Sequence, residues 1–202
     1  MHCEVRILNY PEKELVRKSR NGDIEAFESL IQSYEKRIFN IAYRMTGDRE
    51  DAYDISQEVC IKIYKFIKKF RGDSSFGTWV YRITSNVCID ELRKRKANVI
   101  PFTITNPEGE YEIPVADRDK LPDEAYESKE LSEAIRLCLL QLEPKYRVMI
   151  VLKDIYGYKY EEISKILNIN MGTVKSRINR ARKLLKDELE AGNLLGTNPS
   201  KK

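Results

Sequence analysis

Apolar residues recur every three or four positions along most of the chain, which is the spacing of one face of an α-helix. The pattern is clearest between residues 24 and 45, where it comprises Phe27, Leu30, Ile31, Tyr34, Ile38, Ile41, Ala42 and Met45. Similar patterns predict helices over about 12–20, 49–70, 76–96, 128–142, 144–156, 160–167 and 171–188. Strand-like alternation is almost absent, apart from a short stretch near 99–104. The pattern therefore predicts an all-α protein.

Charge and proline divide this helical pattern into two blocks. Residues 1–96 carry 19 basic and 15 acidic residues, and residues 131–190 carry 12 and 8. Residues 97–130 have a net charge of −6 and hold four of the seven prolines, which is typical of a linker. This linker is either a solvated tether or an acidic mimic of nucleic acid inside a basic channel. We expect two small helical domains, 1–96 and 131–190, joined by a flexible linker and followed by a disordered tail over 191–202.

Composition removes several classes of protein. The 202 residues have a mean hydropathy of −0.54 and no apolar run near the roughly 20 residues that a membrane span needs. The N-terminus lacks the long apolar stretch of a signal peptide, so we expect a cytoplasmic protein without direct membrane insertion. The four cysteines form no CxxC pattern, and the single histidine is His2. The sequence therefore gives little support to a hydrolase with a catalytic or metal-binding histidine. We expect no cofactor, no metal and no enzyme activity.

The predicted helix 49–70 is acidic in its first half and basic in its second. The acidic half holds Glu50, Asp51, Asp54 and Glu58, and the basic half holds Lys62, Lys65, Lys68 and Lys69. This polarity complements the helix macrodipole, which alone is one explanation. The other is a docking face that offers the acids and Gln57 to a basic partner.

Aromatic and basic residues gather between residues 70 and 96. A turn over 71–75 precedes a predicted helix for which Ser74 or Ser75 is a suitable N-cap. The aromatic residues are Phe70, Phe76, Trp79 and Tyr81, and one helical face carries Arg82, Asn86, Asp90 and Arg93. Aromatic rings can stack on the bases of single-stranded nucleic acid while cations bind its phosphates. The alternative is that the rings belong to a core and the basic end complements the helix dipole.

Residues 160–188 have the pattern of a helix-turn-helix with a basic recognition helix. Asn170 is a good N-cap for the second helix, whose buried positions Val174, Ile178, Ala181 and Leu185 lie within about 60° of one another. Gly172, Ser176, Asn179 and Lys183 lie nearly opposite, and residues 171–186 include six basic and no acidic residues. In a major groove, Lys175 can reach guanine or a phosphate and Asn179 can read adenine. We expect Arg177, Arg180 and Arg182 to bind phosphates.

These motifs together resemble a known family. Residues 54–59 (DISQEV), 70–83 (FRGDSSFGTWVYRI) and 86–93 (NVCIDELR) closely resemble region 2 of extracytoplasmic-function (ECF, group IV) sigma factors. These are small bacterial subunits of RNA polymerase in the sigma-70 family. Residues 142–147 (LEPKYR), 160–163 (YEEI) and 172–182 (GTVKSRINRAR) resemble region 4. The resemblance covers about 12–96 and 130–188 and implies a region 2 helical bundle and a region 4 helix-turn-helix domain.

The resemblance implies three binding surfaces. The first docks on the β′ clamp helices of bacterial core RNA polymerase and comprises Asp51, Asp54, Gln57, Glu58 and Lys62. The second captures a flipped base and melts and reads the minus-10 promoter element, with Gly72, Asp73, Ser74, Ser75, Phe76, Trp79, Arg82, Asn86, Asp90 and Arg93. The third reads the minus-35 element, with Tyr160, Gly172, Thr173, Lys175, Ser176, Arg177, Asn179 and Arg180. The implied partners are core polymerase (including its β flap), promoter DNA and an anti-sigma factor, which could hold the chain at a membrane.

The sequence departs from the family at a few positions, and two other functions stay open. Cys60 stands where the family often has Phe, Gly77 where Arg is frequent, and Asn179 at a position that varies with the promoter. One alternative is a stand-alone helix-turn-helix regulator whose N-terminal domain senses a ligand or dimerises. The other is a nucleic-acid-modifying enzyme with Asp48, Asp51 and Asp54 as metal ligands. The basic, aromatic stretch favours the sigma factor, because strand separation needs it and a sensor domain does not.

Overall fold

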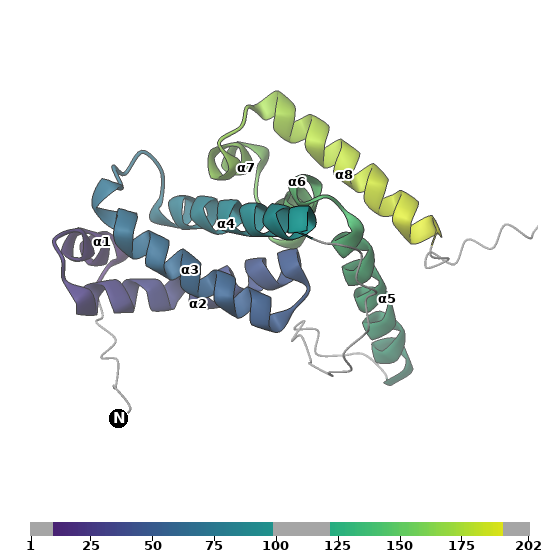
Figure 1. The fold of residues 1–202 in the computed structure, drawn as a ribbon, viewed down its shortest axis with the longest axis horizontal. Coiled ribbons are helices and arrows are strands. Elements are labelled where there is room, and N and C mark those ends of the chain that lie inside the picture. The colour runs from purple at the N-terminus through teal and green to yellow at the C-terminus, as the bar shows by residue number, and fades with distance from the viewer. Residues whose placement is uncertain (1–9, 99–121, 192–202) are drawn as a thin grey trace, which may run out of the picture.

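Helices make up both halves of the chain (Figure 1). The computed structural model describes residues 10–98 and 122–191, and every structural statement below refers to these parts. The N-terminal domain comprises α1 (Glu12–Arg20), α2 (Ile24–Thr46), α3 (Arg49–Phe66), the 3₁₀ turn η1 (Ile67–Lys69) and α4 (Phe76–Asn98). The C-terminal domain comprises α5 (Pro122–Gln141), α6 (Pro144–Ile150), the π-helical segment η2 (Val151–Ile155), α7 (Tyr160–Leu167) and α8 (Met171–Ala191). The prediction of an all-α protein with two helical domains is confirmed.

Helix bounds follow the sequence pattern closely, with three differences. The helix expected over 49–70 ends at Phe66 and continues as the 3₁₀ turn η1. The helix expected from residue 128 begins at Pro122, and proline suits a first helical position because its missing N–H has no partner there. The helix expected over 144–156 changes to π-helical turns after Ile150, with Tyr156 N–H donating to Val151 O at 3.1 Å. The possible strand near 99–104, most of the predicted linker and nearly all of the predicted tail lie outside the described residues.

Short polar side chains begin the main helices. The carboxylate of Asp23 accepts a hydrogen bond from Ala26 N–H at 3.0 Å at the start of α2, and Asp48 accepts from Asp51 N–H at 2.9 Å at the start of α3. Each of these bonds satisfies one of the N–H groups that a helix leaves without an internal partner. At the end of α2, Gly47 has φ +77°, a left-handed conformation that glycine adopts without strain.

The N-terminal domain is a bundle in which α2 packs against α1, α3 and α4. The predicted apolar face of α2 is buried, with only Phe27 partly exposed. The 3₁₀ turn η1 continues the buried face of α3. Ile67 is buried four residues after the buried Ile63, whereas Phe66 is 42% exposed.

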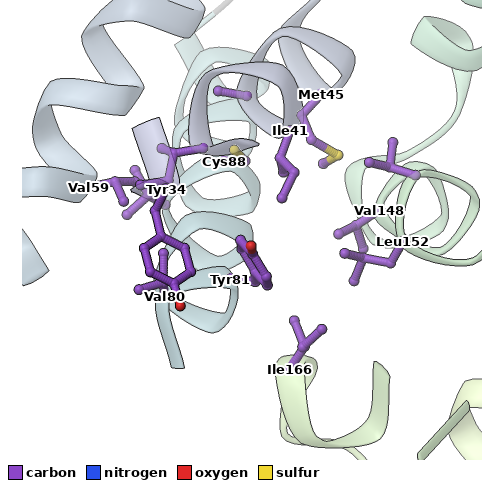
Figure 2. Close-up of a cluster of buried hydrophobic side chains, with 14 of the residues drawn as sticks. Tyr34, Ile41, Met45, Val59, Val80, Tyr81, Cys88, Val148, Leu152 and Ile166 are labelled. Atoms are coloured by element: carbon purple, nitrogen blue, oxygen red, sulfur yellow. The ribbon is translucent and has the colours of Figure 1, made fainter. Parts of the chain in front are cut away.

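The C-terminal domain packs directly on the N-terminal domain through α4. Helix α4 contacts α6 and α7 as well as α2 and α3, so it lies between the rest of the N-terminal domain and the C-terminal domain (Figure 1). Val148, Leu152 and Ile166 of the C-terminal domain face Met45 and Tyr81 of the N-terminal domain in one hydrophobic cluster (Figure 2). The buried core is therefore continuous across both domains. Among the described residues, no helix is both long and apolar enough to cross a bilayer.

Candidate nucleic-acid interface

The outward face of α3 combines acidic, amide and apolar side chains. Asp54 and Gln57 are exposed, and Glu58 forms an ion pair with Lys62 at 2.8 Å one turn away. Asp51 is not free, because Arg95 of α4 binds its carboxylate, and this bond raises the pKa of Arg95. Asp54 and Gln57 are therefore the predicted docking residues most open to a partner.

Sequence reasoning missed the apolar part of this face. Tyr53, Ile61 and Tyr64 are 59%, 51% and 50% exposed. With Gln57 they are spaced four, four and three residues apart, so they form one row along the helix. The spacing of these residues is present in the sequence. The row lies next to the buried row of α3, however, so the sequence pattern does not distinguish it from additional core positions. An exposed row of two tyrosines and an isoleucine beside acids is suited to bind a protein surface.

The loop before α4 has an exposed polar tip on an aromatic base. Gly72, Asp73 and Ser75 are exposed, Ser74 is half-buried, and Gly72 has φ +83°. Ser75 is the N-cap of α4, since its hydroxyl accepts from Thr78 N–H at 3.1 Å. Ser74 donates to Ser75 O at 3.3 Å. The helix cap thus holds the loop at the N-terminal end of α4 with its polar groups facing solvent.

The aromatic residues below this loop form a packed group. Phe76 lies 5.5 Å from Phe70, Trp79 and Tyr34, measured between ring centroids, and is only 3% exposed. Tyr81 is also buried, whereas Trp79 is half-buried. In this structure Phe70, Phe76 and Tyr81 therefore belong to the hydrophobic core, which is the alternative to stacking on bases. Trp79 is the member of the group with ring surface left for a base.

The polar row on α4 faces the C-terminal domain. Arg82 is half-buried, and Asn86, Asp90 and Arg93 are exposed. The last three line a hollow of about 160 Å³, together with Ile89 of α4 and with Lys145, Val148, Leu167 and Arg177 from the other domain. The structure thus brings three residues predicted for minus-10 reading beside Arg177, predicted for minus-35 reading.

Helices α7 and α8 form the predicted helix-turn-helix. Asn168 ends α7 in a left-handed conformation (φ +53°), and the side chain of Asn170 accepts from Thr173 N–H at 2.8 Å to begin α8. Ser164 donates to Ile169 O at 2.6 Å and fixes the turn from within. The buried residues are Ile163, Ile166, Val174, Ile178 and Ala181. The predicted cap is confirmed, and so are three of the four predicted buried positions of α8. The fourth, Leu185, is only half-buried and packs against the edge of the core.

The outer face of α8 is polar and basic, as the pattern predicted. Its exposed residues are Gly172, Lys175, Ser176, Asn179 and Arg180, and Thr173 and Arg177 are half-buried. Arg182 is instead bound by Asp154, with Arg182 Nε 3.2 Å from the carboxylate, and the pKa of Arg182 rises because of that bond. Tyr160 is half-buried beneath Lys153, whose Nζ lies 5.2 Å from its ring centre. The exposed set leaves a continuous strip for DNA.

Two of the three carboxylates considered as metal ligands have structural partners. Asp48 caps α3, and Asp51 binds Arg95. Asp54 would therefore have to bind a metal ion without Asp48 or Asp51. Across residues 10–98 and 122–191, no group of three or more His, Cys, Asp or Glu side chains is placed to hold a metal ion. The geometry therefore gives no support to the metal-dependent enzyme.

Comparisons with known proteins agree with both halves of this description. Residues 30–98 match Sigma-70 region 2, and residues 132–185 match Sigma-70, region 4. The chain is 40% identical over 180 residues to the ECF RNA polymerase sigma factor SigW of Bacillus subtilis, covering 88% of this chain and 96% of that protein. It is 30% identical over 184 residues to the ECF RNA polymerase sigma-E factor of Escherichia coli K12, covering 89% and 94%.

Two solved structures share the fold. CnrH, in complex with the cytosolic domain of CnrY, superposes with a TM-score of 0.63 at 22% identity, covering 89% of this chain and 97% of CnrH. The sigma factor RpoE of Bartonella quintana, in complex with the anti-sigma factor NepR, gives 0.58 at 20% identity and covers 81% and 96%. With both sigma-70 regions matched in order and close relatives aligned over nearly their full length, this chain belongs to the ECF RNA polymerase sigma factors of the sigma-70 family.

Proposed function

We propose that this chain is a promoter-specificity subunit of group IV that binds bacterial core RNA polymerase, recognises minus-35 and minus-10 elements and stabilises the melted bubble. One observation carries the proposal: a single chain presents an exposed acidic and aromatic row on α3 and a basic recognition helix, α8. In this role the chain is not an enzyme, because the polymerase carries the chemistry. A net charge of +4 is low for a protein that binds DNA alone, because phosphate neutralisation supplies most non-specific affinity. It suits a protein that reads DNA within a larger complex.

The polymerase-binding surface is the outward face of α3. Asp54, Gln57 and Glu58 bind the β′ clamp helices, and the exposed Tyr53, Ile61 and Tyr64 supply apolar contact area. Asp51 and Lys62 contribute through ion pairs that position this face: Asp51 with Arg95 of α4, and Lys62 with Glu58. The C-terminal domain contacts the β flap.

The minus-10 surface is the loop before α4 together with the polar row of α4. The exposed tip Gly72–Ser75 captures a base flipped from the duplex, and Trp79 stacks beside it. Phe76 supports the loop from below because it is buried. Arg82, Asn86, Asp90 and Arg93 contact the separated strand.

The minus-35 surface is the exposed strip of α8, entering the major groove from its N-terminal end. Lys175 and Asn179 reach base edges, and Arg177 and Arg180 bind phosphates. Thr173, Ser176 and Tyr160 contact the sugar-phosphate backbone of the DNA. Gly172 permits close approach of the start of α8 to the DNA backbone. An added Cβ there would meet only Asn170 Oδ1, at 3.4 Å, so nothing within the described protein requires a glycine. A membrane-associated anti-sigma factor is the proposed regulator of a cytoplasmic protein.

The proposal is tested by retention of core RNA polymerase on the purified chain. Asp54→Arg/Glu58→Arg reverses two charges on the α3 face and should abolish retention. Glu25→Arg/Glu28→Arg makes the same change in net charge on exposed positions of α2 and should leave retention intact. If the wild-type chain retains no polymerase but binds duplex DNA tightly alone, the stand-alone regulator replaces this proposal.

A further inference from the structure

A hollow of about 310 Å³ opens on the N-terminal domain, between the C-terminal end of α1 and the 3₁₀ turn η1. It is lined by Arg17, Arg20, Asn21 and Lys68. Three of these four side chains are cationic, and none is acidic. The hollow is therefore a concave basic site, and it belongs to none of the three surfaces proposed above.

The end of α1 does not use these cations to complete its own hydrogen bonds. Asn21 N–H donates to Lys18 O at 2.9 Å, and Gly22 N–H donates to Ser19 O at 3.1 Å. Asp23 N–H also donates to Lys18 O, at 3.2 Å. Backbone N–H groups of the following turn thus already bond these last-turn carbonyl groups, which side chains would otherwise have to satisfy.

The cations keep donors for a ligand. Arg17 donates from Nε and Nη2 to the carboxylate of Glu14, at 3.0 and 2.6 Å, which leaves Nη1 for another acceptor. Glu14 offsets part of the charge of Arg17, so Arg20 and Lys68 carry most of the charge of the site. Both are exposed, and they come from two elements far apart in sequence. Guanidinium and ammonium groups that converge in this way are suited to bind phosphate.

The hollow lies next to the loop proposed to capture a flipped base. In Figure 1, α1 lies beside the end of α3, where the chain passes through η1 into the loop before α4. Lys68 and Gly72 are four residues apart, so their Cα atoms are at most about 14 Å from each other. Along the chain the loop lies between the hollow and the polar row of α4. A strand whose base enters the loop therefore passes α4 on one side and reaches the hollow on the other within a few nucleotides.

The lining favours a phosphate backbone over other occupants. Pockets for small molecules are lined mostly by apolar and aromatic side chains, and the centres of protein interfaces are depleted of charge. This hollow has no apolar or aromatic side chain in its lining. A nucleic-acid backbone presents repeated negative charge and needs no apolar contact.

We infer that the hollow between α1 and η1 binds phosphate groups of the single strand of DNA that leaves the loop before α4. Arg20 and Lys68 hold the strand, and Arg17 and Asn21 supply further donors. The contact is to the backbone and carries no sequence information, so it stabilises the open strand on any promoter. The place of this strand in a melted promoter rests on the proposed function, whereas the anion site does not.

The test measures binding of a fluorescein-labelled single strand of random sequence to the full chain, by fluorescence anisotropy at several salt concentrations. Arg20→Ala/Lys68→Ala removes two exposed cations of the hollow, and Lys13→Ala/Lys36→Ala makes the same change in charge at exposed positions outside it. For single strands the logarithm of the binding constant falls with the logarithm of salt concentration, with a slope of about 0.7 per phosphate bound. The slope of the hollow variant should therefore be smaller by about 1.4, and its binding about 25-fold weaker at about 0.1 M salt if the two proteins bind equally at about 1 M. The control should keep the wild-type slope.

Two further measurements identify the source of a loss. Binding of a labelled duplex should change less than about threefold, because the exposed strip of α8 binds the duplex. Retention of core polymerase should stay at the wild-type level, because neither Arg20 nor Lys68 lies on the outward face of α3. If circular dichroism shows that the double variant loses helicity, Lys68→Gln alone removes one charge and should lower the slope by about 0.7.

An unchanged slope in the folded variant overturns the inference, and so does a wild-type chain that binds no single strand. Equal losses on single strand and duplex also overturn it, because the hollow would then bind duplex DNA. Loss of polymerase retention with strand binding intact assigns the hollow to a protein partner instead. If the wild-type chain retains no polymerase while the hollow variant loses strand binding, the anion site stands and the proposed function fails.

Discussion

Cys88 shows how a single buried side chain makes stability depend on pH. It is fully buried in α4, and burial raises the pKa of its thiol to about 12. In the unfolded chain the thiol ionises near pH 9, so between pH 9 and 12 the unfolded state binds fewer protons than the folded state. The contribution is complete below pH 9 and is lost as pH rises through that window.

We expect the free energy of unfolding to fall by about 1 kcal/mol between pH 9 and 10 through Cys88 alone. Urea unfolding at the two pH values measures it. Cys88→Ala should lower the measured slope by about that amount, and the remainder comes from the buried Tyr34 and the half-buried Tyr156 and Tyr158, whose pKa values are also raised. The substitution also lowers stability at every pH by leaving a cavity. Cys60→Ala, at a half-buried position, is the control and should keep most of the slope. Equal slopes in all three proteins would contradict the assignment.

Residues differ in how well their roles could be predicted. The cap Asn170 was predicted because a helix start needs a side-chain acceptor just before the apolar pattern begins. Phe76 was predicted to contact DNA, and the structure buries it, because periodicity does not separate a core ring from a stacking ring. Arg82 binds a backbone oxygen 83 residues away, and a backbone acceptor leaves no trace in sequence.

At the scale of elements, α8 was the most predictable and carries a specific test. Lys175→Ala/Asn179→Ala should weaken recognition of the minus-35 element, since a good base contact contributes about 1–3 kcal/mol of discrimination. Holoenzyme can be used to select duplexes from a random pool, and sequence preference at minus-35 should fall while that at minus-10 persists. Lys186→Ala, paired with Glu190 on the same helix, is the control. Loss of polymerase binding in the double variant would contradict the division into two modules.

The start of α4 makes a different prediction, about strand separation. Trp79→Ala should reduce bubble formation, followed by permanganate reactivity, more than it reduces duplex binding, because a stacked base exists only after melting. Trp79 also packs on Phe70 at 5.3 Å, so Trp79→Phe is the control that keeps ring packing. Equal losses in the permanganate and duplex assays would count against a melting role.

For the whole molecule, the pattern predicted the domains but not their contact. Helix periodicity reports which face is buried, and it does not report against which element. The surface that joins the domains includes Met45, Tyr81 and Ile166, and each also fits the core of its own domain. The charge blocks indicated two basic domains, which repel each other at long range. Apolar burial and helix-end hydrogen bonds nevertheless hold them together at short range.

A core that runs through both domains should unfold as one unit. Trp79 is the chain's only tryptophan and lies in the N-terminal domain, whereas far-ultraviolet circular dichroism reports helices of both domains. In urea the two signals should therefore change with one midpoint, which is the test of a single cooperative transition. Arg136 Nη1 of α5 donates to Gly47 O at 3.1 Å, and Leu140 packs on Gly47. In Arg136→Ala/Leu140→Ala this contact is lost, so the circular dichroism transition should broaden or divide while the Trp79 transition stays single. Two separate midpoints in the wild-type chain would show that each domain is stable by itself and that their contact contributes little to the stability of either.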